Sequence, residues 1–598
     1  MILFVGLVTA AALLYAAGAQ LDYINHQREK MKITINPPLE NAPPSLAFAT
    51  VAMGAFRGLV VDILWMRADK LKEEGQFFDA RQLAEWITVL QPRFAAVWEF
   101  HAWNMAYNIS VAIPASQAEQ RWQWVRNGYE LLRDKGIPLN PKSLRLYREL
   151  GRIFQHKLGG VSDDAHQYYK LRLAEAMGPL LESPDNELSR GDNAYFEALI
   201  RAPKEWAEVA ADPNMALFLE ALRAADESFT ADESCVQKYL ALRRNPQGFK
   251  PEAFEVIDIY RGTDALKRFD IFAKAWQLRH EWKLEPALMQ KVNQMHGPVD
   301  LNDPNIHYPL DWRHPDSHAI YWAVKAFDVA AQGEGRELDI RETNTDRIVL
   351  HSLQNLFRYG KIMILEGPAQ LATEESVDQQ TRLMRRDIFL GPDLRIFDSY
   401  NKASVAVLEK YADDRGSLQA LQNGHRNMLK NAVLSFYQSG LRRKALDIYN
   451  ELRRRYPLND FKVPLEQYVK NRFTEELDSI GIHDATEQIA AILIDSYYLY
   501  AIRDDDAAAG REQLAQEIYD FYYAKYGPDE RIDLPTMRVL RYFALGQFVG
   551  SEAYPPYVRE GLLARIKVER PELFKQLEQT EGELRQQMEQ LQQTQNQG

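Results

Sequence analysis

The stretch NAVLSFYQSGLRRKALDIYNELRRRYP at residues 431–457 decides the fold, because its small and terminating residues recur at the same intervals far earlier in the chain. The two sets, in matching order, are Gly440, Ala445 and Pro457, and Gly75, Ala80 and Pro92. Each set places a glycine where a turn must form, an alanine where two helices must pack closely, and a proline where the second helix must stop. The pattern predicts helical hairpins that stack into an all-α array, an architecture used mainly as a binding surface.

The length and charge of the chain limit the classes of protein to which it can belong. Its 598 residues exceed what one compact core accommodates, whereas in a stacked array each unit buries its neighbour. The formal net charge of -12 argues against nucleic acid as a partner. The single cysteine, Cys235, excludes an intramolecular disulfide, a Cys-ligated zinc site and a lipoprotein anchor. We expect no cofactor.

The N-terminal segment predicts a membrane attachment. Residues 2–20, ILFVGLVTAAALLYAAGAQ, are almost all apolar or small, and their length is close to that which spans a bilayer. They predict a transmembrane helix over residues 1–21, or a signal cleaved after Ala19, although the basic region that precedes a signal's apolar core is missing. By the positive-inside rule, the basic residues that follow, Arg28, Lys30 and Lys32, would leave the body in the cytoplasm. An apolar segment at the start of a large chain and the scarcity of cysteine favour a periplasmic body instead.

The remaining chain divides by composition. Four prolines predict an extended spacer within residues 22–45. Residues 46–66 are apolar, but Arg57 and Asp62 among them favour a buried first helix over a second membrane span. No later stretch alternates with period two for long enough to predict a sheet. We expect an N-terminal array over 46–182, an irregular helical insertion over 183–315, a C-terminal array over 316–570 and a Gln/Glu-rich helical tail over 571–598.

Two proline-aromatic steps in the N-terminal part have the same length. Trp98 follows Pro92 by six residues, and Tyr147 follows Pro141 by six residues. The order after Tyr147 continues with Leu150, Gly151 and Phe154. With these positions the chain resembles the tetratricopeptide repeat (TPR) family, whose unit is a 34-residue helix-turn-helix. The resemblance implies a TPR-like helical-hairpin solenoid, with weaker units over 318–332, 344–367 and 489–526. The chain is also similar to bacterial membrane-anchored TPR-like proteins, for which a role in envelope or transport complexes has been suggested.

The same resemblance implies a concave groove lined by one face of successive helices. If Trp98 holds the aromatic position of its unit, helical spacing places four residues on that face, Glu99, Phe100, Trp103 and Tyr107. With Tyr147 in that position, the next helix contributes Arg145, Arg148, Arg152 and His156. We expect the partner to be a protein, through an acidic peptide segment or as part of a membrane complex. The alternatives are aromatic packing against residues 114–119 and salt bridges from the arginines to Glu149 or Asp134.

One segment is compatible with catalysis. The sequence ALMQ at residues 287–290 resembles a short piece of the lytic transglycosylases, helical enzymes that cut peptidoglycan with one glutamic acid. The nearby acids Glu281 and Glu285 lack the serine that follows the acid in that family. A helix face that buries Leu288 and Met289 is the alternative reading of this segment.

A histidine-rich segment, HYPLDWRHPDSH, covers residues 307–318. His314 and His318 have the one-turn spacing of two metal ligands, but Pro315 pushes His314 out of helical geometry. We therefore expect no metal site, and Asp316 or Ser317 capping the following helix. The function expected overall is a membrane-tethered scaffold that binds another protein and is not an enzyme. The alternatives are a periplasmic peptidoglycan-acting enzyme and a binder of a soluble ligand through this segment.

Overall fold

The computed structural model describes residues 57–181, 193–331, 340–368, 384–479, 485–526, 535–551 and 554–597. The chain is predominantly helical, with 78% of it in helices and little strand, as expected. The predicted membrane segment at 1–21 and the proline-rich spacer at 22–45 lie outside the described residues. Among the helices that are described, none combines the length and the apolar character required to cross a membrane.

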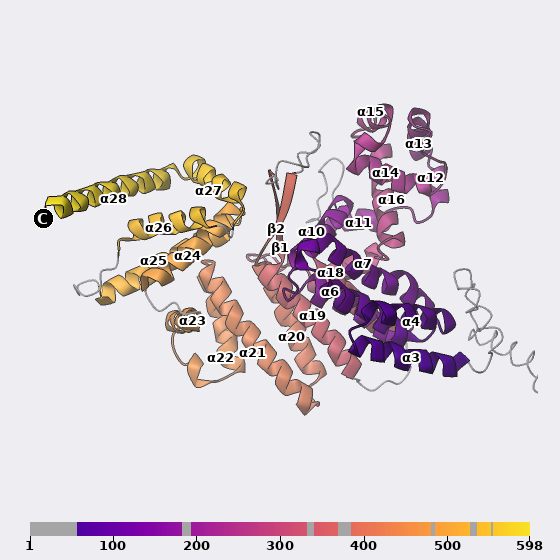
Figure 1. Cartoon of the computed structure of the whole chain (residues 1–598), viewed down its shortest axis with the longest axis horizontal. Helices are drawn as coiled ribbons and strands as arrows, with labels where there is room; N and C mark the ends of the chain where they lie inside the picture. The colour runs from indigo at the N-terminus through magenta and orange to yellow at the C-terminus, as the bar shows by residue number, and fades with distance from the viewer. Residues whose placement is uncertain are drawn as a thin grey trace, which may run out of the picture.

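The chain begins with a stack of paired helices, drawn in indigo in Figure 1. In order these are α3 (Arg57–Glu73), α4 (Phe77–Leu90), α5 (Ala95–Trp103), η2 (Asn104–Ile109), α6 (Ser110–Ala112), η3 (Ala115–Gln117), α7 (Ala118–Glu130), η4 (Leu131–Gly136), α8 (Ile137–Leu139), α9 (Leu144–Arg152), η5 (Ile153–Leu158), α10 (His166–Met177) and η6 (Gly178–Leu181). The segments η2, η4 and η5 are π-helical turns that continue α5, α7 and α9. Such wider turns occur most often where a helix surface has a functional role.

The glycine, alanine and proline pattern has the structural meaning that the sequence predicts. Gly75 and Gly440 each have φ at +76°, in the left-handed region that glycine adopts without strain. Ala80 and Ala445 are fully buried where the two helices of each hairpin meet. The two turns are therefore equivalent, although they belong to opposite halves of the chain.

The proline-aromatic steps are also equivalent. The indole Nε1 of Trp98 donates a 2.8 Å hydrogen bond to the carbonyl oxygen of Pro92, and the hydroxyl of Tyr147 donates one of 3.1 Å to that of Pro141. In both units an aromatic side chain in the first helix thus ties itself to the end of the preceding unit. The buried ring satisfies its polar atom there, which a buried aromatic residue requires.

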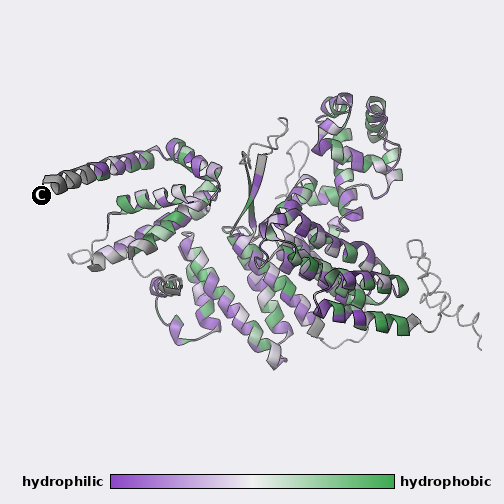
Figure 2. Cartoon of the chain, in the orientation of Figure 1, coloured by the Kyte–Doolittle hydropathy of each residue, from purple (hydrophilic) through white to green (hydrophobic). Residues whose placement is uncertain are grey.

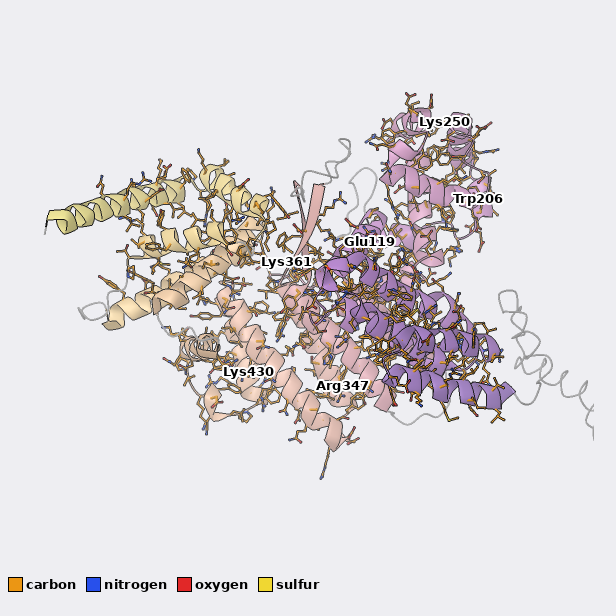
Figure 3. The ribbon with its side chains drawn as sticks, viewed as in Figure 1. Glu119, Trp206, Lys250, Arg347, Lys361 and Lys430 are labelled. Carbon is orange, nitrogen blue, oxygen red and sulfur yellow. The ribbon has the colours of Figure 1, made fainter. Side chains whose placement is uncertain are left out.

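After α10 the chain forms a lobe that projects from the stack at the upper right of Figure 1. Its helices are α11 (Asn193–Arg201), α12 (Trp206–Ala211), α13 (Pro213–Ala225), α14 (Ser234–Arg244), η7 (Pro246–Gly248), α15 (Pro251–Ile259), α16 (Asp264–His280) and α17 (Pro286–His296). Helices α12 to α16 enclose a hydrophobic core of their own, centred on Phe218, Tyr239 and Phe269. Trp206 and Lys250 mark the outer part of this lobe in Figure 3.

Helix α18 (Pro315–Ala331) returns from the lobe and packs along α9 and η5. Gly151 permits the approach, since a Cβ there would lie 3.3 Å from the carbonyl oxygen of Ala319. Residues more than 150 positions apart in sequence thus form one layer of the stack. Helix α19 (Ile340–Tyr359) packs on α18 in turn.

A two-stranded antiparallel hairpin, β1 (Lys361–Pro368) and β2 (Met384–Gly391), follows α19. The expectation of a body without strands is therefore wrong at this point, and so is the predicted repeat unit over residues 344–367. Ile362 and Ile388 pack on Ala174 of α10, while Phe389 on the opposite face lies 6.2 Å from the ring of Tyr498. Because both faces are covered, β1 is a continuous apolar run without the alternation that signals a half-exposed strand.

The second half of the chain comprises η8 (Leu394–Ile396), α20 (Phe397–Lys410), α21 (Arg415–Gln438), α22 (Arg442–Arg455), η9 (Asn459–Phe461), α23 (Leu465–Ser479), α24 (Ala485–Ala501), α25 (Asp505–Tyr526), α26 (Met537–Gly550), α27 (Pro556–Glu569) and α28 (Pro571–Gln597). One hydrophobic cluster runs from Val61 in α3 to Leu577 in α28. In Figure 2 hydrophobic and hydrophilic residues are interspersed along nearly every helix, as expected when each helix buries one face against its neighbours. The hairpin lies at the centre, between the two halves (Figure 1).

Candidate functional site

The eight residues predicted to line a groove lie on two adjacent helices. Glu99, Phe100 and Trp103 are on α5, and Tyr107 is on η2, which continues it. The three arginines are on α9 and His156 is on η5, and this second helix packs on the first. The structure brings the residues of the first helix into direct contact with those of the second. We call this set of eight residues the partner surface.

Glu99 is the electrostatic centre of the partner surface. One of its carboxylate oxygens accepts a hydrogen bond from Nε of Arg145, and the other lies 3.4 Å from Nη2 of Arg148. Arg152 instead pairs with Glu149 through two bonds of 2.9 and 2.7 Å. The alternative of a salt bridge to Glu149 is thus correct for Arg152. When Glu149 is counted with the partner surface, three arginines lie beside two glutamates, and the net charge is positive.

The aromatic residues form a layer beneath these charges. Trp103 and Tyr107 are stacked with centroids 6.0 Å apart, and Tyr107 lies 5.7 Å from the ring of His156. The guanidinium of Arg152 lies over the ring of Tyr107 at 5.0 Å, an arrangement favoured by the ring's quadrupole. Burial raises the pKa of Tyr107. The pKa of His156 is lowered by burial and by the neighbouring charges of Arg152 and Lys157.

Two residues of α3 that the sequence did not single out extend this layer. The ring of Trp65 lies 5.1 Å from that of Phe100, and the amine of Lys72 lies within 6.0 Å of the rings of both Phe100 and Trp103. The sequence did not predict Trp65 and Lys72, because helical spacing identifies neighbours only within one helix. These two residues reach the surface through packing between neighbouring helices.

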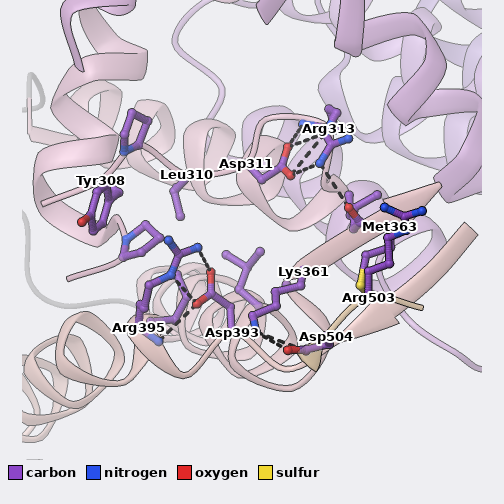
Figure 4. Close-up of a pocket in the computed structure, with 16 residues that line it drawn as sticks. Tyr308, Leu310, Asp311, Arg313, Lys361, Met363, Asp393, Arg395, Arg503 and Asp504 are labelled. Atoms are coloured by element: carbon purple, nitrogen blue, oxygen red, sulfur yellow. Dashed lines mark hydrogen bonds and ion pairs between the residues drawn. The ribbon is translucent and has the colours of Figure 1, made fainter. Parts of the chain in front are cut away.

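A separate pocket of about 360 Å³ lies where the base of the hairpin meets both halves of the chain (Figure 4). Two Asp-x-Arg turns form opposite walls. In each, an aspartate accepts hydrogen bonds from the backbone and the guanidinium two residues later, with closest guanidinium distances of 2.6 Å for Asp311–Arg313 and 2.8 Å for Asp393–Arg395. Lys361 pairs with Asp504 between them at 2.9 Å. The cations named here each have a carboxylate partner, so these walls are close to electrically neutral.

Two of the three histidines of the histidine-rich segment, His314 and His318, are buried, whereas His307 is exposed. His314 is fully buried, and its Nδ1 accepts a 3.2 Å hydrogen bond from the backbone nitrogen of Asp316 at the start of α18. The cap is thus His314, and the expectation of Asp316 or Ser317 in that role is wrong, because Pro315 itself occupies the first helical position, where its fixed φ fits. No group of three or more possible ligands is arranged to hold a metal ion in the part of the chain that the structure describes.

The segment at residues 287–290 lies on α17. Met289 is fully buried, and Glu285 precedes the helix with its carboxylate 3.4 Å from Nε of Arg279. Both carboxylate oxygens of Glu281 accept hydrogen bonds from side-chain amides, at 3.1 Å from Gln237 and 2.5 Å from Gln277. The two acids therefore have different partners, amides for Glu281 and a guanidinium for Glu285.

No protein-family model matches the chain, and no curated protein matches it significantly.

Proposed function

We propose that this protein is a membrane-tethered, TPR-like scaffold or adaptor that binds another protein through the partner surface, in a bacterial envelope or transport complex. The observation that carries the proposal is the convergence of eight residues from two helices into one aromatic and arginine-rich layer. Arginine and aromatic side chains are the residue types that dominate binding energy at protein interfaces. Catalysis forms no part of this role.

The charge distribution indicates the kind of partner. The chain is acidic overall, yet the partner surface has more arginines than glutamates, and Arg145 is exposed. An acidic peptide segment would be attracted to this surface and repelled by most of the remaining protein. Glu99 pairs with two of the three arginines, so its carboxylate competes with an acidic segment for them. It thereby affects how strongly such a segment binds.

The membrane tether is supported by the apolar residues 2–20. It is also supported by α3, which buries Val61 and Ala68 but leaves an apolar stripe exposed among the described residues, Leu59, Ile63 and Met66. The body is assigned to the periplasmic side. Protease treatment of intact spheroplasts tests this assignment, because a periplasmic body is digested and a cytoplasmic one is protected.

Opposite substitutions within one ion pair test the partner surface. Arg148→Gln should weaken capture of the partner in a crosslinking pull-down from native membranes by roughly 3- to 10-fold, through loss of a charge contact. Glu99→Gln breaks the same ion pair but should strengthen capture, because it removes the negative charge that competes with an acidic segment. A purely structural role would make both variants fail together.

Two controls complete the experiment. Arg454→Glu reverses an exposed charge on α22, far from the partner surface in sequence, and should leave capture unchanged. A zymogram on purified cell walls tests the enzymatic alternative with Glu281→Gln as its matched variant. Clearing by the parent protein that disappears in this variant would replace the scaffold role with a peptidoglycan-acting one.

A further inference from the structure

A second pocket, of about 610 Å³, lies between the N-terminal stack and the lobe. Its walls are α7 with η4 and α10 on one side, and α14 and α16 with the loop that follows α16 on the other. Pockets of this size at the junction of two structural units are common sites for small ligands. The sequence gives no motif for it, because its lining comes from several segments spread over residues 122–283.

The lining is rich in positive charge. Five arginine or lysine side chains and three carboxylates line the pocket. Three of the cations have acidic partners, at 2.8 Å for Arg126, 2.7 Å for Arg133 and 2.8 Å for Arg172. The other two have no carboxylate partner among the described residues. The guanidinium of Arg244 donates to the amide oxygen of Gln277, at 3.3 Å, and the amine of Lys283 makes no hydrogen bond or ion pair with them. One carboxylate of the lining, that of Glu281, also has no cation partner among the described residues, since its oxygens accept hydrogen bonds from amides. With five cations against three carboxylates the lining remains positive, which favours an anionic ligand in an otherwise acidic protein.

The backbone at Lys283 supports a role for its amine. Lys283 has φ at +56°, one of two non-glycine residues with positive φ in the described chain. A glycine would adopt this conformation without strain, so the lysine side chain is held here at an energetic cost. The buried hydroxyl of Tyr321 fixes the loop, donating to the carbonyl oxygen of Lys283 at 3.3 Å and accepting from the nitrogen of Glu285 at 2.8 Å.

Aromatic side chains supply an apolar wall next to these charges. The guanidinium of Arg133 lies 5.6 Å from the ring centroids of both Tyr129 and Trp282. Trp282 is adjacent to Lys283 and is only partly buried. A ring or hydrocarbon portion of a ligand can therefore pack on Trp282 while its charged group reaches Lys283.

We propose that this pocket binds a small ligand that carries a phosphate or carboxylate group, with the oxyanion held by Arg244 and Lys283. The site is independent of the partner surface, which lies on other elements, α5, η2, α9 and η5, and shares no residue with the pocket. Phosphate and carboxylate share the same recognition chemistry here, namely acceptor oxygens that meet a guanidinium and an ammonium.

The test uses the full-length protein in detergent, with sodium pyrophosphate and sodium citrate as probes at constant ionic strength. Binding is followed by calorimetry and by the change in tryptophan fluorescence, to which the partly buried Trp282 contributes. We expect one probe to bind with a one-to-one stoichiometry, and Arg244→Gln to weaken its binding roughly ten-fold or more, because a charge-assisted hydrogen bond is lost. Tighter binding of pyrophosphate than of citrate would indicate a phosphate ligand, and the reverse order a carboxylate ligand.

A matched pair of glycine variants separates ligand binding from backbone effects. Lys283→Gly should reduce probe binding to the same extent as Arg244→Gln, while its melting temperature is unchanged or higher because the left-handed backbone is relieved. Arg503→Gly relieves the other positive-φ residue, at +67°, which lies outside this pocket, and should leave binding unchanged. The proposal is overturned if neither probe binds at about 10 mM, or if Lys283→Gly binds as well as Arg503→Gly does.

Discussion

The amine of Lys361, in the first residue of β1, lies 2.9 Å from the Oδ1 carboxylate oxygen of Asp504, 143 positions later in the chain. This ion pair joins the hairpin to the turn between α24 and α25. On the same strand pair, Asp387 accepts a 2.7 Å hydrogen bond from the hydroxyl of Tyr557 in α27. The other face of the hairpin packs on α10. The hairpin therefore ties the two halves of the chain to each other, and Figure 3 shows Lys361 at that junction.

Removal of the Lys361 amine should destabilise the protein, because the Asp504 side chain is only 4% exposed and would lose its cation. For Lys361→Met we expect a loss of about 1–3 kcal/mol in the free energy of unfolding, measured by urea denaturation. The control is Lys291→Met. Lys291 forms an ion pair with Asp328 in which both side chains are about half exposed, so its removal should lower the free energy of unfolding by less than about 0.5 kcal/mol. Equal losses in the two variants would argue against a structural tie at the hairpin.

Glycine substitutions distinguish turn geometry from helix propensity. In Gly75→Ala the added Cβ meets no neighbouring atom, so the whole effect comes from the left-handed φ. We expect the free energy of unfolding to fall by about 1 kcal/mol. Gly424→Ala also meets open space, but within the exposed middle of α21, where alanine should stabilise by roughly 0.5–1 kcal/mol. Opposite shifts of the denaturation midpoint are the expected outcome, and shifts of the same sign would contradict the left-handed turn at Gly75.

The hydrogen bond from Tyr147 to Pro141 can be removed without changing the shape of the side chain. Tyr147→Phe should lower the free energy of unfolding by about 1 kcal/mol, because the hydrogen bond from the buried tyrosine to the carbonyl oxygen of Pro141 is lost. Tyr260→Phe serves as the control, since the Tyr260 hydroxyl has no hydrogen bond among the described residues, and should have almost no effect. Denaturation curves of the two variants, recorded together, check the difference.

His101 gives a prediction about pH. Burial, followed by the charges of Arg81 and Lys135, lowers its pKa to about 3, and neither ring nitrogen has a hydrogen-bond partner among the described residues. The unfolded chain therefore binds the proton at higher pH than the folded protein does. The stability from neutral His101 is complete above about pH 6.5 and decreases as pH falls toward 3, by up to about 1.4 kcal/mol per pH unit.

Two variants at this position separate titration from burial. Both His101→Leu and His101→Gln should reduce the slope of unfolding free energy against pH between 4 and 6.5. The reduction should correspond to the uptake of roughly one proton on unfolding. Only His101→Leu should also gain stability at pH 7, by about 1 kcal/mol, because it removes the buried polar atoms without partners. An unchanged pH slope in both variants would show that His101 is not buried as a neutral group.

Local signals in the sequence determined the repeated hairpins and one surface. Gly75, Ala80 and their counterparts Gly440 and Ala445 specify turn and close packing through backbone conformation and side-chain size, which depend little on distant residues. The eight residues of the partner surface could be chosen because helical spacing places neighbours within a helix, and the repeat phase aligns one helix with the next. That they lie together is visible only in the structure, as is the pairing of Glu99 with two arginines.

Tertiary packing decided the rest. The hairpin could not be predicted from alternation, because α10 covers one face and the region around Tyr498 covers the other, so both faces of β1 are apolar. The strained backbone at Lys283 lies in a loop held by Tyr321, which is distant in sequence. The pocket between the stack and the lobe forms where α7, η4 and α10 meet α14, α16 and the loop that follows α16. Local pattern fixes which segments become helices, whereas the meeting of distant segments fixes which polar groups become buried and which remain available to a ligand.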